Sequence, residues 1–218
     1  MTRHTNDEKV INYPEIMIEW DFDSDLDPEA ADFYNSLNKI LEPRGQHAAG
    51  CVWVETSEEE SVTSVMILVD DELMHRTGSS IARIALYGED LHPEITIDSE
   101  YYLALQDGTM NLSSIYHELG HYYSGHMVSD NGIDDHDIMY AGRIAGEEKW
   151  VNQEVEADLF AAHYVSPLDI LDAFTERENY IFKQQLLGLV DKEISKAQLR
   201  EYSKRYAMVE FYMDSLAS

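Results

Sequence analysis

SSIYHELGHYYSGH, residues 113–126, contains the pattern H-E-x-x-H at His117, Glu118 and His121, and the fold and chemistry expected of the chain follow from it. Positions i and i+4 of a helix lie one turn apart on the same face. His117 and His121 can therefore present two imidazole nitrogens to one ion, about 2.0–2.1 Å away if it is zinc. Glu118 is then placed to take a proton from water as general base. The pattern predicts a metal-binding helix.

A third protein ligand is needed, and the sequence offers three candidates. Zinc peptidases of the metzincin type place a third histidine six residues after the second, whereas His126 comes one residue early. Glu154 and Glu156 lie in a second predicted helix, from about 147 to 164. Gluzincin-type peptidases take a glutamate from such a helix, followed four residues on by Asp or Asn, as in Glu154 and Asp158. Glu156 lies about 200° around the helix from Glu154. We therefore assign Glu154 as the ligand and Asp158 as acceptor of a ligand histidine's outer N–H.

Two sequence blocks also resemble a known family. HELGHYYSGH resembles the HELGHxxxGH signature of ImmA/IrrE family metallopeptidases, and EVEADLFAAHYVSP resembles that family's second signature. The second match runs through Glu154, Glu156, Ala157, Asp158, Phe160, Ala161, Ala162 and Pro167. The resemblance implies a cytosolic zinc endopeptidase that cuts an intracellular regulatory protein, such as a transcriptional repressor.

The predicted fold is α+β and zincin-like, with a small β-sheet packed on the HExxH helix and a helical part after it. Alternating apolar residues predict a strand over 16–22, and a hairpin is expected from 51–54 and 62–69. Asp27-Pro28 should open a helix, and residues 95–98 and 101–105 read as short strands. The HExxH helix should begin near Asn111 or Ser113, with hydroxyls as caps, and end around Gly125.

We expect one metallopeptidase domain over 1–218, with a core of about 10–176 and a helical C-terminal extension of about 177–218. The extension is rich in basic residues, including Lys192, Lys196, Arg200, Lys204 and Arg205. These residues either contribute to partner choice or pair with the acidic body of the protein. On the first interpretation, truncation after about Thr175 should leave the metal site intact.

Composition restricts the partners. The 43 acidic and 15 basic residues give a formal net charge of −28. Such a charge repels phosphate backbones, so direct nucleic-acid binding is not expected. Cys51 is the single cysteine, which rules out an intrachain disulfide and thiolate metal clusters. Neither a signal peptide nor an apolar run long enough for a membrane span is found, so a cytoplasmic protein is expected.

Several interpretations stay open at this level. The leading one is an endopeptidase with one Zn²⁺ per chain. The others are an acidic zinc-containing binding protein (an antirepressor or inhibitor) that acts by occlusion, and a zinc hydrolase with a small substrate. An intact Glu118 disfavours pure occlusion, because a structural site needs no base. Oligomeric state and cleavage site are not encoded in any motif, and an oxyanion-stabilising donor could be any of His126, His136, Tyr140 and His163.

Overall fold

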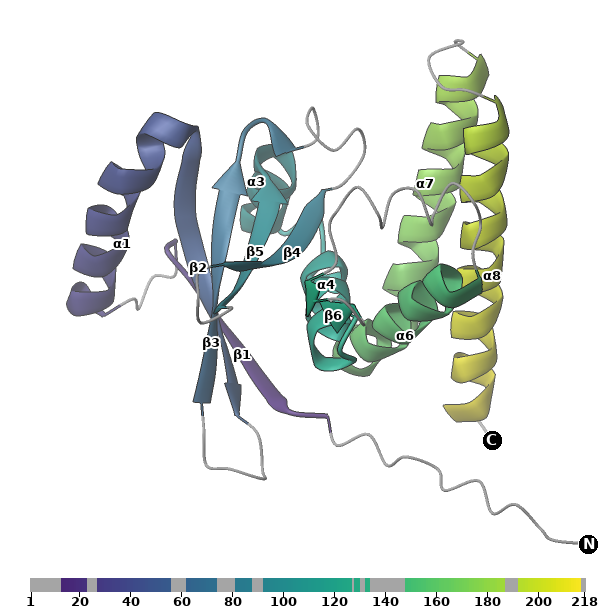
Figure 1. Cartoon of the computed structure of the whole chain (residues 1–218), viewed down its shortest axis with the longest axis horizontal. Helices are drawn as coiled ribbons and strands as arrows, with labels where there is room; N and C mark the ends of the chain where they lie inside the picture. The colour runs from purple at the N-terminus through teal and green to yellow at the C-terminus, as the bar shows by residue number, and fades with distance from the viewer. Residues whose placement is uncertain are drawn as a thin grey trace, which may run out of the picture.

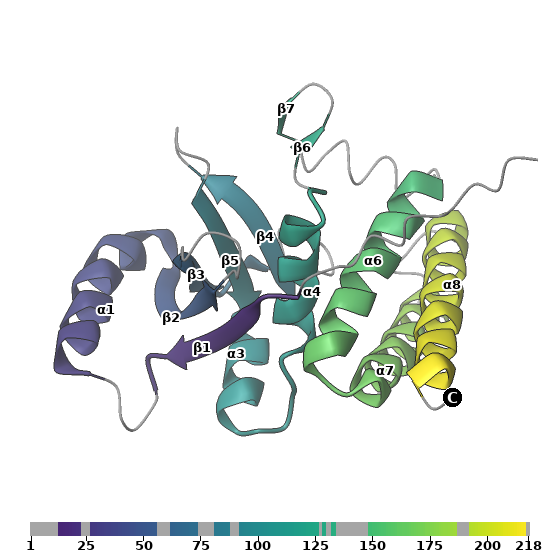
Figure 2. The ribbon, with the colours of Figure 1, turned by 90° about the horizontal axis from the view of Figure 1, so that it is seen from below.

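The computed structural model of the chain describes residues 13–22, 27–55, 62–73, 81–87, 92–126, 128–129, 132–133, 148–186 and 192–216. Within these ranges the fold is α+β, with a five-stranded mixed sheet and six α-helices arranged in layers (Figures 1 and 2). None of the described helices combines the length and the apolarity that a membrane crossing requires.

The sheet has the strand order β1-β2-β3-β5-β4. Its strands are β1 (Glu15–Trp20), β2 (Gln46–Glu55), β3 (Val62–Asp70), β4 (Ala82–Tyr87) and β5 (His92–Asp98). β1, β2 and β3 pair antiparallel, β3 and β5 pair parallel, and β4 runs antiparallel to β5 at one edge. The expected β2–β3 hairpin and the strands in 16–22 and 95–98 are therefore confirmed.

Helices cover both faces of this sheet (Figure 2). On one face lies α1 (Pro28–Leu41), where Tyr34 and Leu41 pack with Ala48 and Leu68 of the sheet. The Asp27 side chain accepts the Glu29 amide at 2.7 Å, as the Asp27-Pro28 pair predicts. A 3-10 turn, η1 (Glu42–Arg44), follows α1 and leads into β2.

The opposite face carries α3 (Ser99–Gln106) and α4 (Ser113–Tyr123). The expectation of a strand over 101–105 is wrong, because these residues belong to α3. Two local features explain the helix. The Asp98 carboxylate accepts the Glu100 amide at 2.9 Å and caps the first turn. Tyr101 and Tyr102 are both buried although they are adjacent, which a strand with one covered face does not allow.

The remaining helices extend the structure away from the sheet (Figure 1). After the short hairpin β6 (Val128–Ser129) and β7 (Gly132–Ile133) come α6 (Glu148–Tyr164), α7 (Pro167–Leu186) and α8 (Lys192–Leu216). Phe174 of α7, and Tyr202 and Val209 of α8, are buried in the same apolar cluster as the core residues of β3 and β5. A separable extension beginning near 177 stays a prediction, but α7 crosses that point as one helix.

Candidate metal site

The metal-binding helix predicted from HExxH is α4, and its apolar side holds it on the sheet. Ile115 and Leu119 are fully buried, one turn apart, which leaves His117 and His121 on a neighbouring face of the same helix. The helix begins where the Asn111 side chain accepts the Ser113 amide at 2.8 Å. The N-cap residue, Leu112, makes no side-chain capping hydrogen bond. The Asn111 carboxamide thus takes the role that was expected of a serine hydroxyl.

Gly120 lets α4 and α6 approach closely. A Cβ atom added at Gly120 would lie 2.8 Å from Ala157 Cα and 2.9 Å from the Ala157 carbonyl oxygen, both backbone atoms that cannot rotate away. The small residues at 120 and 157 are therefore what allows side chains of the two helices to meet.

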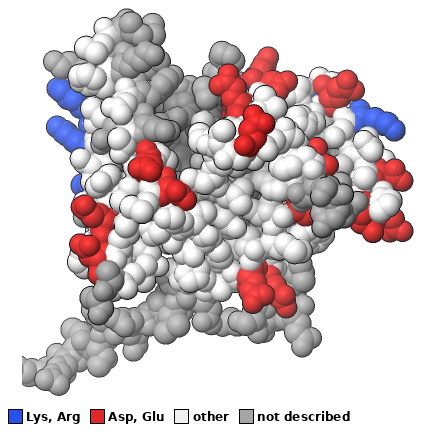
Figure 3. Space-filling model, turned by 180° about the vertical axis from the view of Figure 1, so that it is seen from behind, with Lys and Arg blue, Asp and Glu red and all other residues white. Residues whose placement is uncertain are grey.

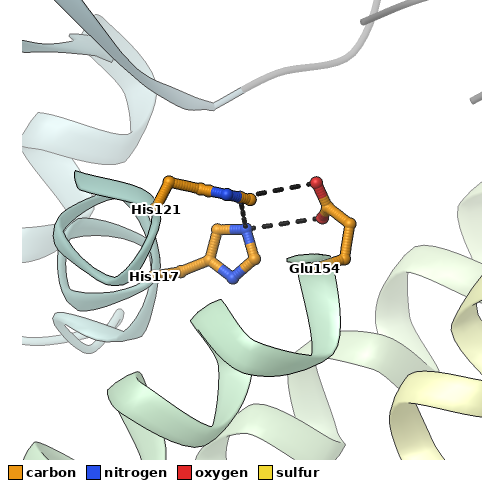
Figure 4. Close-up of side chains that lie close together, drawn as sticks. All are labelled: His117, His121 and Glu154. Atoms are coloured by element: carbon orange, nitrogen blue, oxygen red, sulfur yellow. Dashed lines mark hydrogen bonds and ion pairs between the residues drawn. The ribbon is translucent and has the colours of Figure 1, made fainter. Parts of the chain in front are cut away.

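Side chains from these two helices form the group His117, His121 and Glu154 (Figure 4). The two Nε2 atoms are 3.1 Å apart. Glu154 Oε2 lies 3.5 Å from His117 Nε2, and Glu154 Oε1 lies 3.4 Å from His121 Nε2. Ligand atoms about 2.0–2.1 Å from a tetrahedral zinc are separated by about 3.3–3.4 Å. The spacing and the two-nitrogen, one-carboxylate donor set therefore fit a zinc-type ion, and this group of the described residues could hold one.

His117 is oriented by a buried carboxylate. Its Nδ1 lies 2.8 Å from Asp158 Oδ1, one turn of α6 beyond Glu154, as the sequence predicts. Burial acts to lower the pKa of His117, but Asp158 and Glu154 outweigh burial and raise it to about 10. Positive charge at this ring is thus favoured, whether a proton or a metal ion supplies it.

His121 is oriented by His126, whose Nδ1 lies 3.0 Å from His121 Nδ1. The turn after α4 brings His126 back. Gly125 has φ +74°, its amide bonds to the Tyr122 carbonyl, and the His126 amide bonds to the His121 carbonyl at 2.9 Å. This pair of bonds is a Schellman C-cap, and glycine is favoured where it requires positive φ. His126 Nε2 in turn lies 3.0 Å from the carboxylate of the exposed Glu156.

These contacts assign the proton positions on the rings. If Asp158 accepts from His117 Nδ1, the Nε2 lone pair of His117 is free to face the group. If Glu156 accepts from His126 Nε2, then His126 Nδ1 accepts from His121 Nδ1 and leaves the His121 Nε2 lone pair free as well. With the protons placed in this way, a cation that displaces any proton on His117 Nε2 meets both histidines in the tautomer that a metal requires.

The Glu118 side chain extends from α4 to the edge strand β4. Its Oε2 accepts the backbone amide of Ile84 at 2.9 Å. Burial raises the pKa of the Glu118 carboxyl, and Glu154 adds to this, while His117, His121 and the Ile84 amide act in the opposite direction. One carboxylate oxygen is thus anchored on the sheet edge.

Arg205 of α8 reaches the same site from the far side of α6. Its Nε and Nη2 donate to Asp158 at 2.6 and 2.8 Å, and its Nη1 lies 2.8 Å from Glu154 Oε2. Burial acts to raise the pKa of the Glu154 and Asp158 carboxyls, but Arg205 outweighs it and holds both below their ordinary values. For Arg205, pairing inside the protein is the interpretation that the structure favours. The expectation that truncation after Thr175 spares the site is therefore replaced, because truncation would remove these contacts.

The other predicted site residues lie elsewhere. Glu156 points away from the group, as the helix geometry indicates, although it contacts His126. His163 is exposed on α6 and stacks on Tyr13, with ring centroids 3.9 Å apart. Both ring nitrogens of His126 are engaged by His121 and Glu156, so it supports a ligand rather than acting as one. His136 and Tyr140 lie outside the described residues.

Sequence reasoning did not find the roles of Arg205 and Ile84. A signal for Arg205 is present, because Tyr202, Arg205 and Val209 follow the i, i+3, i+7 spacing of an apolar helix face. A cation on such a face implies buried carboxylates nearby. Ile84 contributes only its backbone, so no side-chain motif could have indicated it.

Comparison with protein-family models, with curated proteins and with solved structures gives no match for this chain. The resemblance to ImmA/IrrE metallopeptidases therefore stays a prediction that rests on the two sequence blocks.

Proposed function

We propose that this protein is a zinc-dependent endopeptidase that cleaves an intracellular regulatory protein. The observation that carries the proposal is the joint placement of His117, His121 and Glu154 with Glu118 next in the chain to the first histidine. A purely structural zinc site is closed by four protein ligands, whereas three ligands and a carboxylate base are typical of a hydrolytic site.

The chain's own residues supply most of the mechanism. When bound, zinc supplies Lewis acidity that polarises the scissile carbonyl and acidifies water. Glu118 accepts the proton of the attacking water and returns it to the leaving amine. The Ile84 amide holds one Glu118 oxygen at 2.9 Å and so limits the directions in which the other oxygen can point. Asp158 and His126 keep the two imidazoles oriented throughout.

A peptide substrate is favoured by the position of β4. This strand is at the edge of the described sheet, and the Ile84 amide faces outward to Glu118. Backbone groups two residues away on either side, at Ala82 and Leu86, face the same way because strand geometry repeats every two residues. An extended peptide that paired with this edge would pass beside the base.

The surface charge favours a protein partner over a nucleic acid. Figure 3 shows one face on which Asp and Glu form several separate groups, while Lys and Arg occur only near its margins. A formal net charge of −28 would attract a basic protein segment and repel a polyphosphate chain.

The test combines metal analysis with a substrate trap. Purified protein never exposed to chelator should contain about one zinc per chain, and Glu118→Gln should keep that zinc because glutamine is nearly isosteric. Wild-type protein should cut a subset of a cytosolic proteome, and Glu118→Gln should instead retain the uncut substrates. Glu210→Gln, on the exposed side of α8, is the matched control and should behave as wild type.

Two outcomes would contradict the proposal. A wild-type protein without transition metal would remove the zinc chemistry. A wild-type protein that holds its partner intact as firmly as Glu118→Gln does would favour the occlusion alternative, in which an acidic zinc protein blocks a regulator without cutting it.

A further inference from the structure

Arg205 is a buried cation that touches two residues of the candidate metal site at once. Only 7% of it is exposed. Its Nε and Nη2 form a two-pronged contact with Asp158, and its Nη1 faces Glu154 Oε2 at 2.8 Å and Glu201 Oε1 at 3.1 Å. Phe174 of α7 and Tyr202 of α8 flank the guanidinium, with its Cζ 5.0 and 5.2 Å from the two ring centroids. A lysine ammonium, with three donors, cannot reproduce these four contacts.

The contact with Asp158 extends to a proposed metal ligand. Asp158 Oδ1 receives both the Arg205 Nη2 and the His117 Nδ1, each at 2.8 Å. The guanidinium therefore fixes the plane of the carboxylate that fixes the His117 ring. Arg205 of α8, Asp158 of α6 and His117 of α4 are therefore linked in series. The series ends at His117 Nε2, the atom that faces His121 and Glu154.

The contact with Glu154 selects between its two oxygens. Each Glu154 oxygen faces one ring nitrogen, Oε2 that of His117 at 3.5 Å and Oε1 that of His121 at 3.4 Å, but only Oε2 also faces Arg205 Nη1, at 2.8 Å. A guanidinium proton occupies a lone pair of Oε2 and leaves Oε1 as the stronger donor to a cation. The arrangement favours binding of a metal by one carboxylate oxygen.

Charge balance adds a second reason for coupling. The carboxylates of Glu154 and Asp158 are both buried in a low-dielectric region, where cationic groups beside them are strongly favoured. Arg205 is one such group, and a divalent cation beside Glu154 would be another. The docking of α8 and the binding of such a cation therefore compensate the same pair of carboxylates from opposite sides of α6.

We propose that Arg205 is a positioning residue of the metal site, and that metal binding and the docking of α8 against α6 strengthen each other. This proposal rests on the metal site of the proposed function. By linkage, any factor by which docked α8 raises metal affinity is the factor by which bound metal favours docking. If Arg205 only attached α8 to the body, its loss would change stability but not the environment of the metal.

The experiment measures Co²⁺ binding by full-length wild-type protein and by Arg205→Met, Arg205→Lys and Lys204→Met. The visible absorption of Co²⁺ reports the geometry of its ligands. Arg205→Met should bind Co²⁺ about 10–100-fold more weakly, as expected when a ligand's supporting residue is lost, with an altered spectrum. Arg205→Lys should fall between, because an ammonium keeps the charge but not the fork. Lys204→Met, on the exposed side of α8, should match wild type.

Hydrogen exchange tests the reverse direction. Saturating Zn²⁺ should slow amide exchange across 192–216 in wild-type protein, and this protection should shrink in Arg205→Lys. If Arg205→Met fails to fold, Arg205→Lys decides the matter, since it retains the buried positive charge. Wild-type affinity and an unchanged Co²⁺ spectrum in Arg205→Lys would overturn the inference and leave the proposed function standing. Absence of metal binding by wild-type protein would overturn both.

Discussion

The two histidines that α4 contributes to the candidate metal site are supported in different ways. His117 is backed by Asp158 and then by Arg205, and both supporting residues are buried. His121 is backed by His126 and then by Glu156, whose side chain is 60% exposed. We call these the inner support and the outer support. The same task, holding an imidazole with Nε2 toward the metal, is thus done once by charges shielded from water and once by a path that ends in solvent.

The two supports differ in their exposure to solvent, and this difference sets how much each contributes to metal affinity. Charge interactions weaken as the groups become solvated, so the inner support should contribute more to metal affinity than the outer one. Water can replace the Glu156 carboxylate as acceptor for His126, whereas a buried Arg205 and His117 have no such replacement for Asp158.

The largest loss should follow removal of Glu154, the proposed third ligand, because neither support can replace it. Glu154→Ala leaves two histidines and water as ligands, so zinc affinity should fall by more than the roughly 10–100-fold that losing a supporting residue costs. Titration against a competing chelator measures it, with Glu210→Ala as control. Should this variant keep wild-type affinity, the ligand would have to be sought elsewhere.

Gly120→Ala should damage both supports together, because its Cβ would lie 2.8 Å from Ala157 Cα and force α4 away from α6. Overpacking of this kind destabilises by about 1–3 kcal/mol. Urea unfolding of the metal-free protein gives the stability, and a zinc titration gives the affinity. Gly120→Ser should be at least as harmful, and a neutral result for both would mean that the helices are not held at this distance.

Asp158→Asn isolates the inner support. The side chain keeps its size but loses the charge that both His117 and Arg205 contact, so zinc affinity should fall about 10–100-fold. The Glu118 base is untouched, and any activity remaining at saturating zinc should therefore be close to that of wild type. A loss of activity that zinc cannot restore would assign Asp158 a different role.

His126→Ala and Glu156→Gln probe the outer support and should have the smallest effects. His126 contacts His121 Nδ1 at 3.0 Å, so its loss should affect metal binding although His126 is not itself a proposed ligand. His126→Ala should weaken zinc binding by about tenfold, at the low end for a supporting residue, and Glu156→Gln by less. If Glu156→Gln were as harmful as Asp158→Asn, burial would not be what separates the two supports.

Of the inner support, the sequence predicts Asp158 of α6 but not Arg205 of α8. Glu154 and Asp158 share a helix, and a spacing of four residues fixes their common face without knowledge of the tertiary fold. The approximate bounds of α4 and α6 could also be predicted, because they too depend on local sequence patterns. What lies beyond one helix was not: Arg205 joins Asp158 across 47 residues, a separation that no local periodicity encodes.

The outer support was not predicted, for a different reason. From the sequence, His126 was considered as a metal ligand that comes one residue early, just after the turn at Gly125. In the structure that turn is a Schellman cap, which directs His126 to the back of His121 instead. The misassigned strand at 101–105 has a similar origin, since the Asp98 cap decides the helix and lies outside the apolar run that was read.

Because the chain is synthesised from its N-terminus, the two residues of the inner support become available at different times. A ribosome delivers Asp158 before Arg205, and 47 residues separate them. At about 5–20 residues per second, that interval lasts roughly 2–10 s. During it Glu154 and Asp158 exist without the guanidinium that compensates them, while the histidines of α4 are already available. A nascent chain therefore passes through a stage in which the residues of the candidate metal site are present but only partly organised, and the site is complete only once α8 has been translated and has docked.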